Sequence, residues 1–390
     1  MSFLRTACAG WLDREGLCRM AFALVVVTGV VFFVSCGSGK LPAFTSGQTA
    51  YVTLPTSNSV LMLHINGLTG VVTPGSQTPQ VSGTAPHGLA LLPGKFLFVA
   101  NSQSNTIAVY SIAGDGSLNL SATPTPVGGT GPDNAVLDSS GQYLFVTNSF
   151  SANISVFSVD SGSGALTAVP GSPFYANDSP GEILIPPGTN FVYVTNSRIG
   201  TVTAFTFSSS TGVLTPAPGS PFVSGPGASG VAVSNNGQYL YVANSTALNP
   251  GSNTVGNISG FTIDSTTGTL TRLANSPFTS AVGSGPSTLI ADPSGRFIFA
   301  TTPGTAYSIW CFTIDPSTGQ LTPSQGSPFS VASGGLFVLT DNIGSFLYIG
   351  SQADHGIEAY TYDSNTGAPS TVLNSPFSTS SPPGKMVIAE

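Results

Sequence analysis

A few charged residues in an otherwise almost uncharged chain are the candidates for chemistry. Charged residues make up 6% of the 390 residues, and the chain has three histidines. Glu182 or His87 could serve as a general base, and Arg198 could stabilise an oxyanion. Together such groups promote the attack of water on a carbonyl carbon. These three residues are therefore the catalytic candidates.

Four further charged residues are candidates for binding a ligand: Asp133, Asp178, Asp354 and His355. They occur irregularly, whereas most other aspartates of the chain recur at fixed turn positions. Irregularity in a repetitive sequence favours a role beyond scaffolding, although solvated loop residues are the alternative. The ligand would be a small molecule, a carbohydrate or a protein.

The composition argues against several other classes of site. The net charge is −7 with dispersed acids, whereas a nucleic-acid partner requires clustered Lys and Arg. The histidines are too scattered for a metal-ligand spacing, so we expect no metal site, and no cofactor can be named. The Gly-rich segment 225–230 lacks the Lys and the helix of a phosphate-binding loop. Cys311 aligns with strand positions Val109 and Val156, which predicts a buried thiol rather than a nucleophile.

A repeated segment indicates how these residues are positioned. An aromatic residue followed by a small or β-branched pair recurs seven times, at Tyr51, Phe98, Phe145, Tyr193, Tyr241, Phe299 and Tyr348. Each interval contains several short strands separated by Gly-containing turns. A period in the forties with this pattern is typical of a β-propeller, in which four strands form a blade. Tandem immunoglobulin-like domains would need about 100 residues each.

The two ends of the repeat complement each other. The first repeat begins with a second-type strand at 50–54, and the chain finishes with a first-type strand at 386–389. Pairing them would close the ring and remove an exposed sheet edge. We therefore predict an all-β fold over residues 44–390: a seven-bladed β-propeller of four-stranded antiparallel blades, closed by the C-terminal strand joining the N-terminal strands.

Strand alternation within a blade sorts the loops onto two faces. If the strands are lettered A to D, the D–A and B–C loops share one face, and all seven candidate residues fall there. The same face carries an insertion at 246–256, where Asn244 and Ile258 are fourteen positions apart, compared with six between Asn148 and Ile154. A lid and a tolerated surface loop are both compatible with it.

Residues 44–390 resemble the bacterial YVTN and lactonase-type β-propellers, which include 6-phosphogluconolactonase. The resemblance rests on Tyr193-Val-Thr-Asn, on Asp-Xaa-Xaa-Thr-Gly-Xaa-Leu turns, and on recurring Gly-Ser-Pro-Phe segments. It implies a propeller fold, and lactone hydrolysis as one activity. The lactonases usually carry Pro-Arg-His at the head of one strand A, and the comparable positions here include Pro86-His87-Gly88 and Pro132-Asp133-Asn134. The Arg-His pair is not found, so catalytic residues do not transfer.

The first 35 residues resemble a bacterial lipoprotein signal. Arg5, Arg14 and Arg19 precede an uncharged run at 20–34, which is shorter than the ~20 residues of a membrane-spanning helix and ends just before Cys36. The resemblance implies removal of residues 1–35, a lipid on Cys36 that attaches the protein to the membrane, and a linker at 36–43. An uncleaved signal anchor is the alternative, and both export the remainder to the envelope or the exterior.

Two functional hypotheses follow. The first is a monomeric, exported, lactonase-like propeller that acts as a binding or protein-interaction scaffold of the cell envelope. The second is a lactone hydrolase of the 6-phosphogluconolactonase type, with its site on the face formed by the D–A and B–C loops.

Overall fold

A computed structural model describes residues 24–27, 30–33, 47–245, 256–279, 285–302, 307–331 and 335–389. It separates into two compact units, Met1–Thr45 and Ser46–Glu390. In the first unit, β1 (Leu24–Val27) pairs with β2 (Val30–Phe33) in an antiparallel hairpin. None of the helices within the described ranges has the length and apolar character needed to cross a membrane. Cys36 and the linker 36–43 lie outside the described residues, as does most of the predicted signal.

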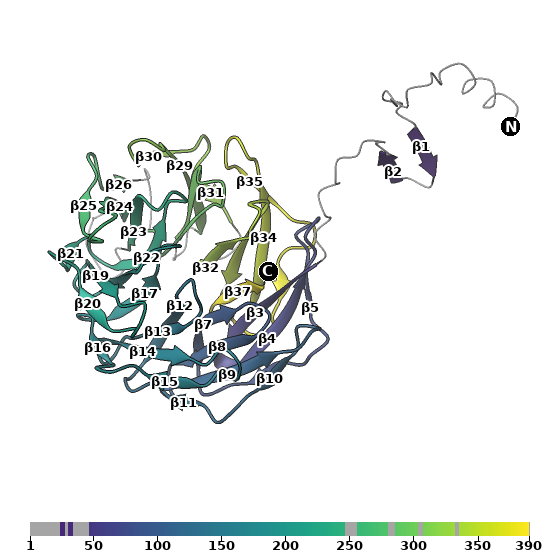
Figure 1. Cartoon of the computed structure of the whole chain (residues 1–390). Coiled ribbons are helices and arrows are strands. Elements are labelled where there is room, and N and C mark those ends of the chain that lie inside the picture. The colour runs from purple at the N-terminus through teal and green to yellow at the C-terminus, as the bar shows by residue number, and fades with distance from the viewer. Residues whose placement is uncertain are drawn as a thin grey trace, which may run out of the picture. The chain divides into compact units, whose positions relative to one another are not determined.

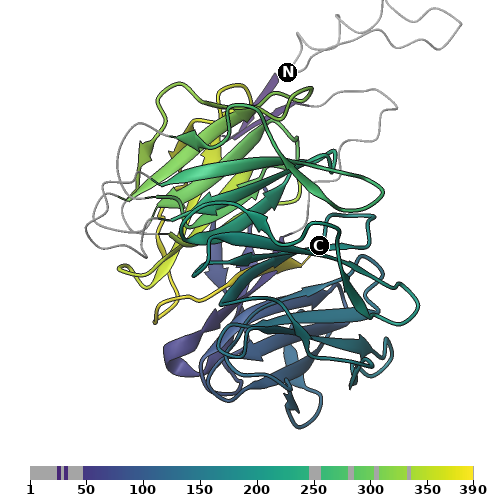
Figure 2. The ribbon, with the colours of Figure 1, turned by 90° about the vertical axis from the view of Figure 1, so that its left-hand side faces the viewer.

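The second unit is a seven-bladed β-propeller, as the sequence predicts (Figure 1). Seven antiparallel sheets follow one another around a ring, and each orders its strands A, B, C and D from the centre outwards. Every sheet also carries a fifth strand of two residues, which pairs with strand C beyond the end of strand D. The predicted four-stranded blade is therefore confirmed, with this short addition. Figure 2 shows the blades again after a turn of 90°.

The blades are numbered in chain order, and the closing blade combines the two ends. The closing blade consists of β37 (Met386–Ala389), β3 (Gln48–Leu54), β4 (Ser59–Ile65), β5 (Val72–Pro74) and β6 (Gln80–Val81). Blade 1 consists of β7 (Pro86–Leu92), β8 (Phe96–Asn101), β9 (Thr106–Ile112), β10 (Leu118–Leu120) and β11 (Thr125–Pro126). Blade 2 consists of β12 (Pro132–Leu137), β13 (Tyr143–Asn148), β14 (Asn153–Val159), β15 (Leu166–Ala168) and β16 (Phe174–Tyr175).

The remaining blades repeat this order. Blade 3 consists of β17 (Pro180–Leu184), β18 (Phe191–Asn196), β19 (Thr201–Phe207), β20 (Leu214–Pro216) and β21 (Phe222–Val223). Blade 4 consists of β22 (Ala228–Val233), β23 (Tyr239–Asn244), β24 (Asn257–Ile263), β25 (Leu270–Arg272) and β26 (Phe278–Thr279). Blade 5 consists of β27 (Thr288–Ala291), β28 (Phe297–Thr302), β29 (Ser308–Ile314), β30 (Leu321–Pro323) and β31 (Phe329–Ser330). Blade 6 consists of β32 (Gly335–Thr340), β33 (Phe346–Ser351), β34 (Gly356–Tyr362), β35 (Pro369–Thr371) and β36 (Phe377–Ser378).

The ring closes as predicted, because β37 pairs with β3. Thr49 lies opposite Ala389, and Val52 lies opposite Met386. In Figure 1 the yellow C-terminal strand accordingly lies beside the purple strand β3. The C-terminal strand thus supplies the innermost strand of a blade whose outer strands come from the N-terminal part of the propeller, and this covers an edge that would otherwise be exposed.

Apolar packing between neighbouring blades forms the core. Strand B is buried along its whole length in blades 1 to 6, consistent with its run of aromatic and β-branched residues. The ring of Phe145 in blade 2 meets that of Phe207 in blade 3 with centroids 5.1 Å apart. The C–D turn of blade 3 also packs on blade 2: a Cβ at Gly212, which has a φ of +71°, would meet the ring of Tyr143. Turn chemistry and inter-blade packing therefore both require glycine at this position.

Candidate functional site

In three blades the pairing register of strand A breaks at the head of the strand, where the candidate residues lie. The pairing of strand A with strand B shifts between Pro86 and Leu89 in blade 1, between Pro132 and Asn134 in blade 2, and between Pro180 and Ile183 in blade 3. His87, Asp133 and Glu182 occupy these breaks. A β-bulge leaves a residue outside the ladder and redirects its side chain, which is why bulges recur beside active sites.

Threonines at the end of strand B hold these bulges in place. Thr53 in the closing blade donates a hydrogen bond to the backbone carbonyl oxygen of His87 in blade 1, at 3.0 Å. Thr147 of blade 2 donates equivalently to Gly181 of blade 3, at 2.8 Å. Each hydroxyl thus links one blade to the strand-A head of the next and fixes the backbone that carries the candidate side chains.

His87 and Asp133 form the first of two charged pairs. Nδ1 of His87 lies 2.9 Å from a carboxylate oxygen of Asp133 and 2.9 Å from the backbone carbonyl oxygen of the same residue. Both partners are acceptors, so Nδ1 carries the proton, and Nε2 of the neutral ring is left as the basic nitrogen. Burial would lower the pKa of His87, but the hydrogen bond and charge of Asp133 outweigh it and raise that pKa.

Glu182 and Lys385 form the second pair. Nζ of Lys385 lies 2.7 Å from Oε2 of Glu182, and the two side chains are 19% and 32% exposed, respectively. Burial would lower the pKa of Lys385, but the charge of Glu182 and its hydrogen bond raise it, so the amine stays protonated. Lys385 directly precedes β37 in the closing blade, whereas Glu182 belongs to blade 3. The pair therefore bridges inner strands three blades apart.

The two pairs form one electrostatic unit at the mouth of the central channel, here called the channel-mouth cluster (His87, Asp133, Glu182 and Lys385). Their inner strands follow one another around the ring as β37, β7, β12 and β17. The positive charge of Lys385 lowers the pKa of Asp133 and opposes protonation of His87. For Asp133, burial acts in the opposite direction, but the hydrogen bond and charge of His87 together with Lys385 hold its pKa below the ordinary value.

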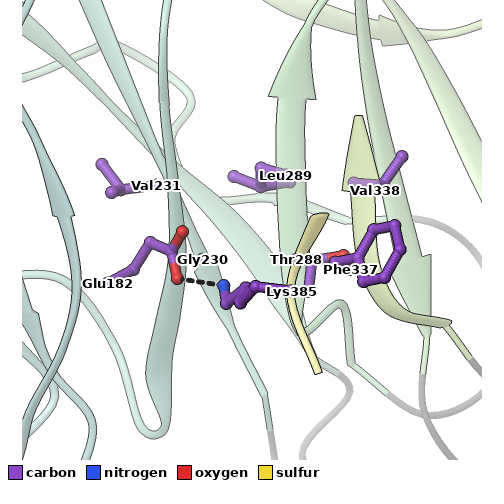
Figure 3. Close-up of a pocket in the computed structure, with 8 residues that line it drawn as sticks. All are labelled: Glu182, Gly230, Val231, Thr288, Leu289, Phe337, Val338 and Lys385. Atoms are coloured by element: carbon purple, nitrogen blue, oxygen red, sulfur yellow. Dashed lines mark hydrogen bonds and ion pairs between the residues drawn. The ribbon is translucent and has the colours of Figure 1, made fainter. Parts of the chain in front are cut away.

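A small cavity adjoins the Glu182–Lys385 pair (Figure 3). Its volume is about 30 Å³, and its other walls come from blades 4, 5 and 6, with Thr288 and Phe337 among them. Such a volume holds about two water molecules. The cavity therefore has room for a water molecule or a hydroxyl group beside the pair.

Arg198, the predicted cation, forms its described ion pair with a residue outside this cluster. Its Nε is 3.3 Å from Oδ2 of Asp178, and the two side chains are 73% and 44% exposed. Asp178 lies in the D–A loop before β17, and Arg198 lies in the B–C loop of blade 3 on the same face. The described contacts of Arg198 thus make it half of a surface ion pair, and Lys385 is the cation that meets Glu182.

Asp354 and His355 shape a turn between β33 and β34. The hydroxyl of Ser351 donates to Oδ2 of Asp354 at 2.9 Å. His355 has a φ of +48°, and its backbone carbonyl oxygen accepts hydrogen bonds from Thr379. Both residues are exposed, and their described contacts are those of a B–C loop. Residues 246–255 of the insertion lie outside the described residues.

Lys385 is the functional candidate that the sequence reasoning missed. It precedes the closing strand, whose blade combines both ends of the chain, and therefore falls outside the D–A loops that recur between consecutive blades. The available signal was positional: Lys385 stands at the head of a strand A, as His87, Asp133 and Glu182 do.

Cys311 is buried, as predicted, and its Sγ lies 3.2 Å from the Ser324 hydroxyl oxygen. Burial raises the pKa of this thiol to about 11, so it stays protonated at neutral pH and is a poor nucleophile. Within the described ranges, no group of three or more His, Cys, Asp or Glu side chains is arranged to hold a metal ion.

Comparison with known proteins identifies a matching family. The family model described as "Lactonase, 7-bladed beta-propeller" matches residues 42–174, 187–339 and 283–383. These segments cover most of the propeller. No protein with curated annotation matches significantly.

Solved structures share the fold at low identity. A putative 6-phosphogluconolactonase from Bacteroides fragilis is 17% identical, with a TM-score of 0.74 over 90% of this chain and 100% of that one. The periplasmic gluconolactonase of Pseudomonas aeruginosa is 18% identical, with a TM-score of 0.73 over 88% of this chain and 99% of that one. A putative 6-phosphogluconolactonase from Bacteroides uniformis is 16% identical, with a TM-score of 0.72 over 88% and 99%. At such identities the likeness establishes the architecture, and function must be argued from the site.

Proposed function

The chain belongs to the lactonase family of seven-bladed β-propellers, and from this premise we propose that it is a monomeric binding propeller that takes up a small hydroxylated ligand at its channel mouth. The observation that carries the proposal is the channel-mouth cluster itself. Partly buried charges lose hydration, and perturbed titratable groups gather at functional sites. In a chain with 6% charged residues, four such side chains around one channel favour a ligand that exchanges hydrogen bonds with them.

The proposal includes export to the cell envelope with a lipid anchor at Cys36. Its support is the N-terminal segment, in which arginines precede an uncharged run that ends at a small residue followed by cysteine. Expression of the full chain and of Cys36→Ser in a bacterial host tests this part. The wild type should fractionate with membranes and carry a diacylglycerol mass on its N-terminal cysteine, and Cys36→Ser should lose both. A soluble, unmodified wild-type protein would overturn it.

Calorimetric titration of the purified full chain with glucose, gluconate and glucono-1,5-lactone tests binding. We expect Lys385→Met and His87→Gln to weaken binding at least tenfold, because each removes a polar partner from the site. Arg198→Gln is the matched control, since it removes a charge from the same face outside the cluster. Equal weakening by all three variants, or none by the first two, would contradict the assignment.

Lactone hydrolysis is the second candidate function, and the tautomer of His87 favours it. With its proton held on Nδ1 by Asp133, the imidazole can accept a proton from water at Nε2. The resulting hydroxide would attack the lactone carbonyl carbon, and the ammonium of Lys385 would stabilise the oxyanion. Cleavage of the ring C–O bond would return the proton to the leaving alkoxide and give the open hydroxy acid.

The pH profile of lactone hydrolysis tests this second function. The base form of His87 predominates only above its raised pKa, so the enzymatic rate should increase with pH through the neutral range. His87→Gln should lose this pH-dependent increase and show only the spontaneous rate, while Arg198→Gln should keep the wild-type pH profile. Binding of glucono-1,5-lactone with no hydrolysis above the spontaneous rate would leave the binding function alone.

A further inference from the structure

An exposed aromatic side chain lies over the loop that leads into strand A of blade 2. Phe150, in the B–C loop of blade 2, is 84% exposed. Its ring lies over Gly131, where an added Cβ would be 2.7 Å from Cδ2 of Phe150. Gly131 also accepts a hydrogen bond from the backbone N–H of Ser149, at 2.8 Å, which ties the two loops together. Gly131 is two residues before Asp133, so the phenyl ring covers the loop that leads into the strand A carrying Asp133.

A second exposed ring continues the same edge outwards. Tyr175 is 71% exposed and belongs to the short fifth strand of blade 2. The pairing register places Pro132 opposite Asn148, Asn148 opposite Asn153, and Asn153 opposite Tyr175. Three inter-strand steps of about 4.8 Å separate the channel strand from Tyr175 by about 14 Å, a span suited to about three sugar rings.

The aromatic pair is peculiar to blade 2, and the B–C loop that carries Phe150 has no charged side chain. The positions equivalent to Phe150 hold Gln103 in blade 1 and Arg198 in blade 3, and the position equivalent to Tyr175 holds Val223 in blade 3. The B–C loop around Phe150 offers only hydroxyl, amide and backbone groups; for example, the Ser151 hydroxyl accepts a hydrogen bond from the backbone N–H of Thr130 at 2.9 Å.

Ring faces beside neutral hydrogen-bonding groups match the chemistry of a glycan. A sugar ring presents an apolar C–H face and a periphery of hydroxyl groups, whereas a protein epitope would favour a larger apolar centre with a charged rim. The cavity of about 30 Å³ beside Glu182 and Lys385 has room for a hydroxyl-sized group, and a longer ligand would extend beyond it.

We infer that the ligand of the channel mouth is a short neutral glycan, whose terminal residue meets the channel-mouth cluster while the following rings stack on Phe150 and Tyr175. This inference rests on the proposed binding function and specifies its ligand class. The proposed site extends outwards from the channel along the edge of blade 2 that carries the B–C loop.

Calorimetric titration with cello- and malto-oligosaccharides of one to four rings tests the inference. In the full-length wild type, affinity for at least one series should increase from one to three rings. Phe150→Ala and Tyr175→Ala should each reduce the affinity of the trisaccharide about tenfold, as expected from losing most of a stacked ring face, and should leave the monosaccharide unchanged. Ile343→Ala, which truncates an exposed apolar side chain outside this edge, is the matched control.

The outcomes separate this inference from the function on which it rests. Equal affinity for one and three rings, insensitivity to both aromatic substitutions, or no binding of either series would overturn the glycan inference. Lys385→Met would still report on the channel-mouth function through its effect on glucose, gluconate or the lactone. Conversely, length-dependent binding that is lost in Phe150→Ala but unaffected by Lys385→Met would establish the aromatic platform and reject the cluster as its end point.

Discussion

Removal of the Glu182 carboxylate should destabilise the propeller, because Lys385 would keep its charge without a counterion. Exposed ion pairs contribute about 0–1 kcal/mol, whereas breaking a buried pair costs about 3–5 kcal/mol. With side chains 19% and 32% exposed and a 2.7 Å contact, this pair lies between those limits. We therefore expect Glu182→Gln to lower the free energy of unfolding by about 2 kcal/mol.

A double-mutant cycle measures the pair itself. Glu182→Gln, Lys385→Met and the double variant are compared with the wild type by urea unfolding, monitored by tryptophan fluorescence. The double variant leaves no unpaired charge, so it should be about as stable as either single variant, which corresponds to a coupling energy of about 2 kcal/mol. The cycle also isolates the link between the closing blade and blade 3 from the β3–β37 ladder, which all four proteins retain.

The reasoning fails if the two substitutions are additive within about 0.3 kcal/mol, because additivity would mean that the charges do not interact in solution. Arg198→Gln is the internal control. It removes one charge of the exposed pair with Asp178, whose side chains are 73% and 44% exposed, and should change stability by no more than about 0.5 kcal/mol.

Three other substitutions or deletions test separate parts of the structure. The pairing of His87 with Asp133 raises the pKa of His87, so this pairing stabilises the fold fully below about pH 6.5, the pKa of an unfolded histidine. The stabilisation is lost as the pH rises through the higher pKa of the folded state. The stability deficit of His87→Gln in urea unfolding should therefore be larger at pH 5.5 than at pH 9. Ala176→Ser should raise the free energy of unfolding by about 1 kcal/mol, because the new hydroxyl could donate to the buried and unpaired Oδ1 of Asn196; no gain in thermal melting would contradict this. Deletion of residues 383–390 should lower the melting temperature strongly by opening the ring, and an unchanged melting curve would reject the clasp.

The serine proposal follows from a comparison between blades. In blade 4 the Ser224 hydroxyl donates to Oδ1 of Asn244 at 2.8 Å. Ala176 occupies the corresponding position of the preceding blade, and its backbone carbonyl oxygen likewise accepts a bond from strand C, from Thr203. Ser224→Ala is thus the reciprocal test, and its loss should match the gain of Ala176→Ser.

Sequence reasoning predicted the elements that repeat. The sequence predicts seven blades and a final strand at 386–389, and the structure contains both, with β37 at Met386–Ala389. These elements follow from local hydrophobic alternation and turn residues, which recur seven times and so reinforce one another.

The Ser-Pro-Phe segments show what local patterns could not predict. Proline cannot donate a hydrogen bond to a ladder, so the residue types of these segments do not indicate a strand. In the structure the Ser172 hydroxyl accepts the backbone N–H of Val156 at 2.9 Å, and the following Phe174 begins the fifth strand. The same bond recurs at Ser220, Ser276, Ser327 and Ser375. The repeat in the sequence shows that the segment recurs, but only the three-dimensional arrangement shows which backbone group the serine meets.

The missing Arg-His pair does not remove the chemical groups that such a site requires. Here the imidazole comes from blade 1 and its orienting carboxylate from blade 2. The cation comes from Lys385, at the head of the closing strand. A ring makes this substitution possible because every strand A brings its first residues to the same channel, so a given group can be supplied from any blade without changing the scaffold. A search for one motif at one strand head can therefore miss a site whose groups are supplied by several blades. The lactone titrations of His87→Gln and Lys385→Met examine that chemistry directly.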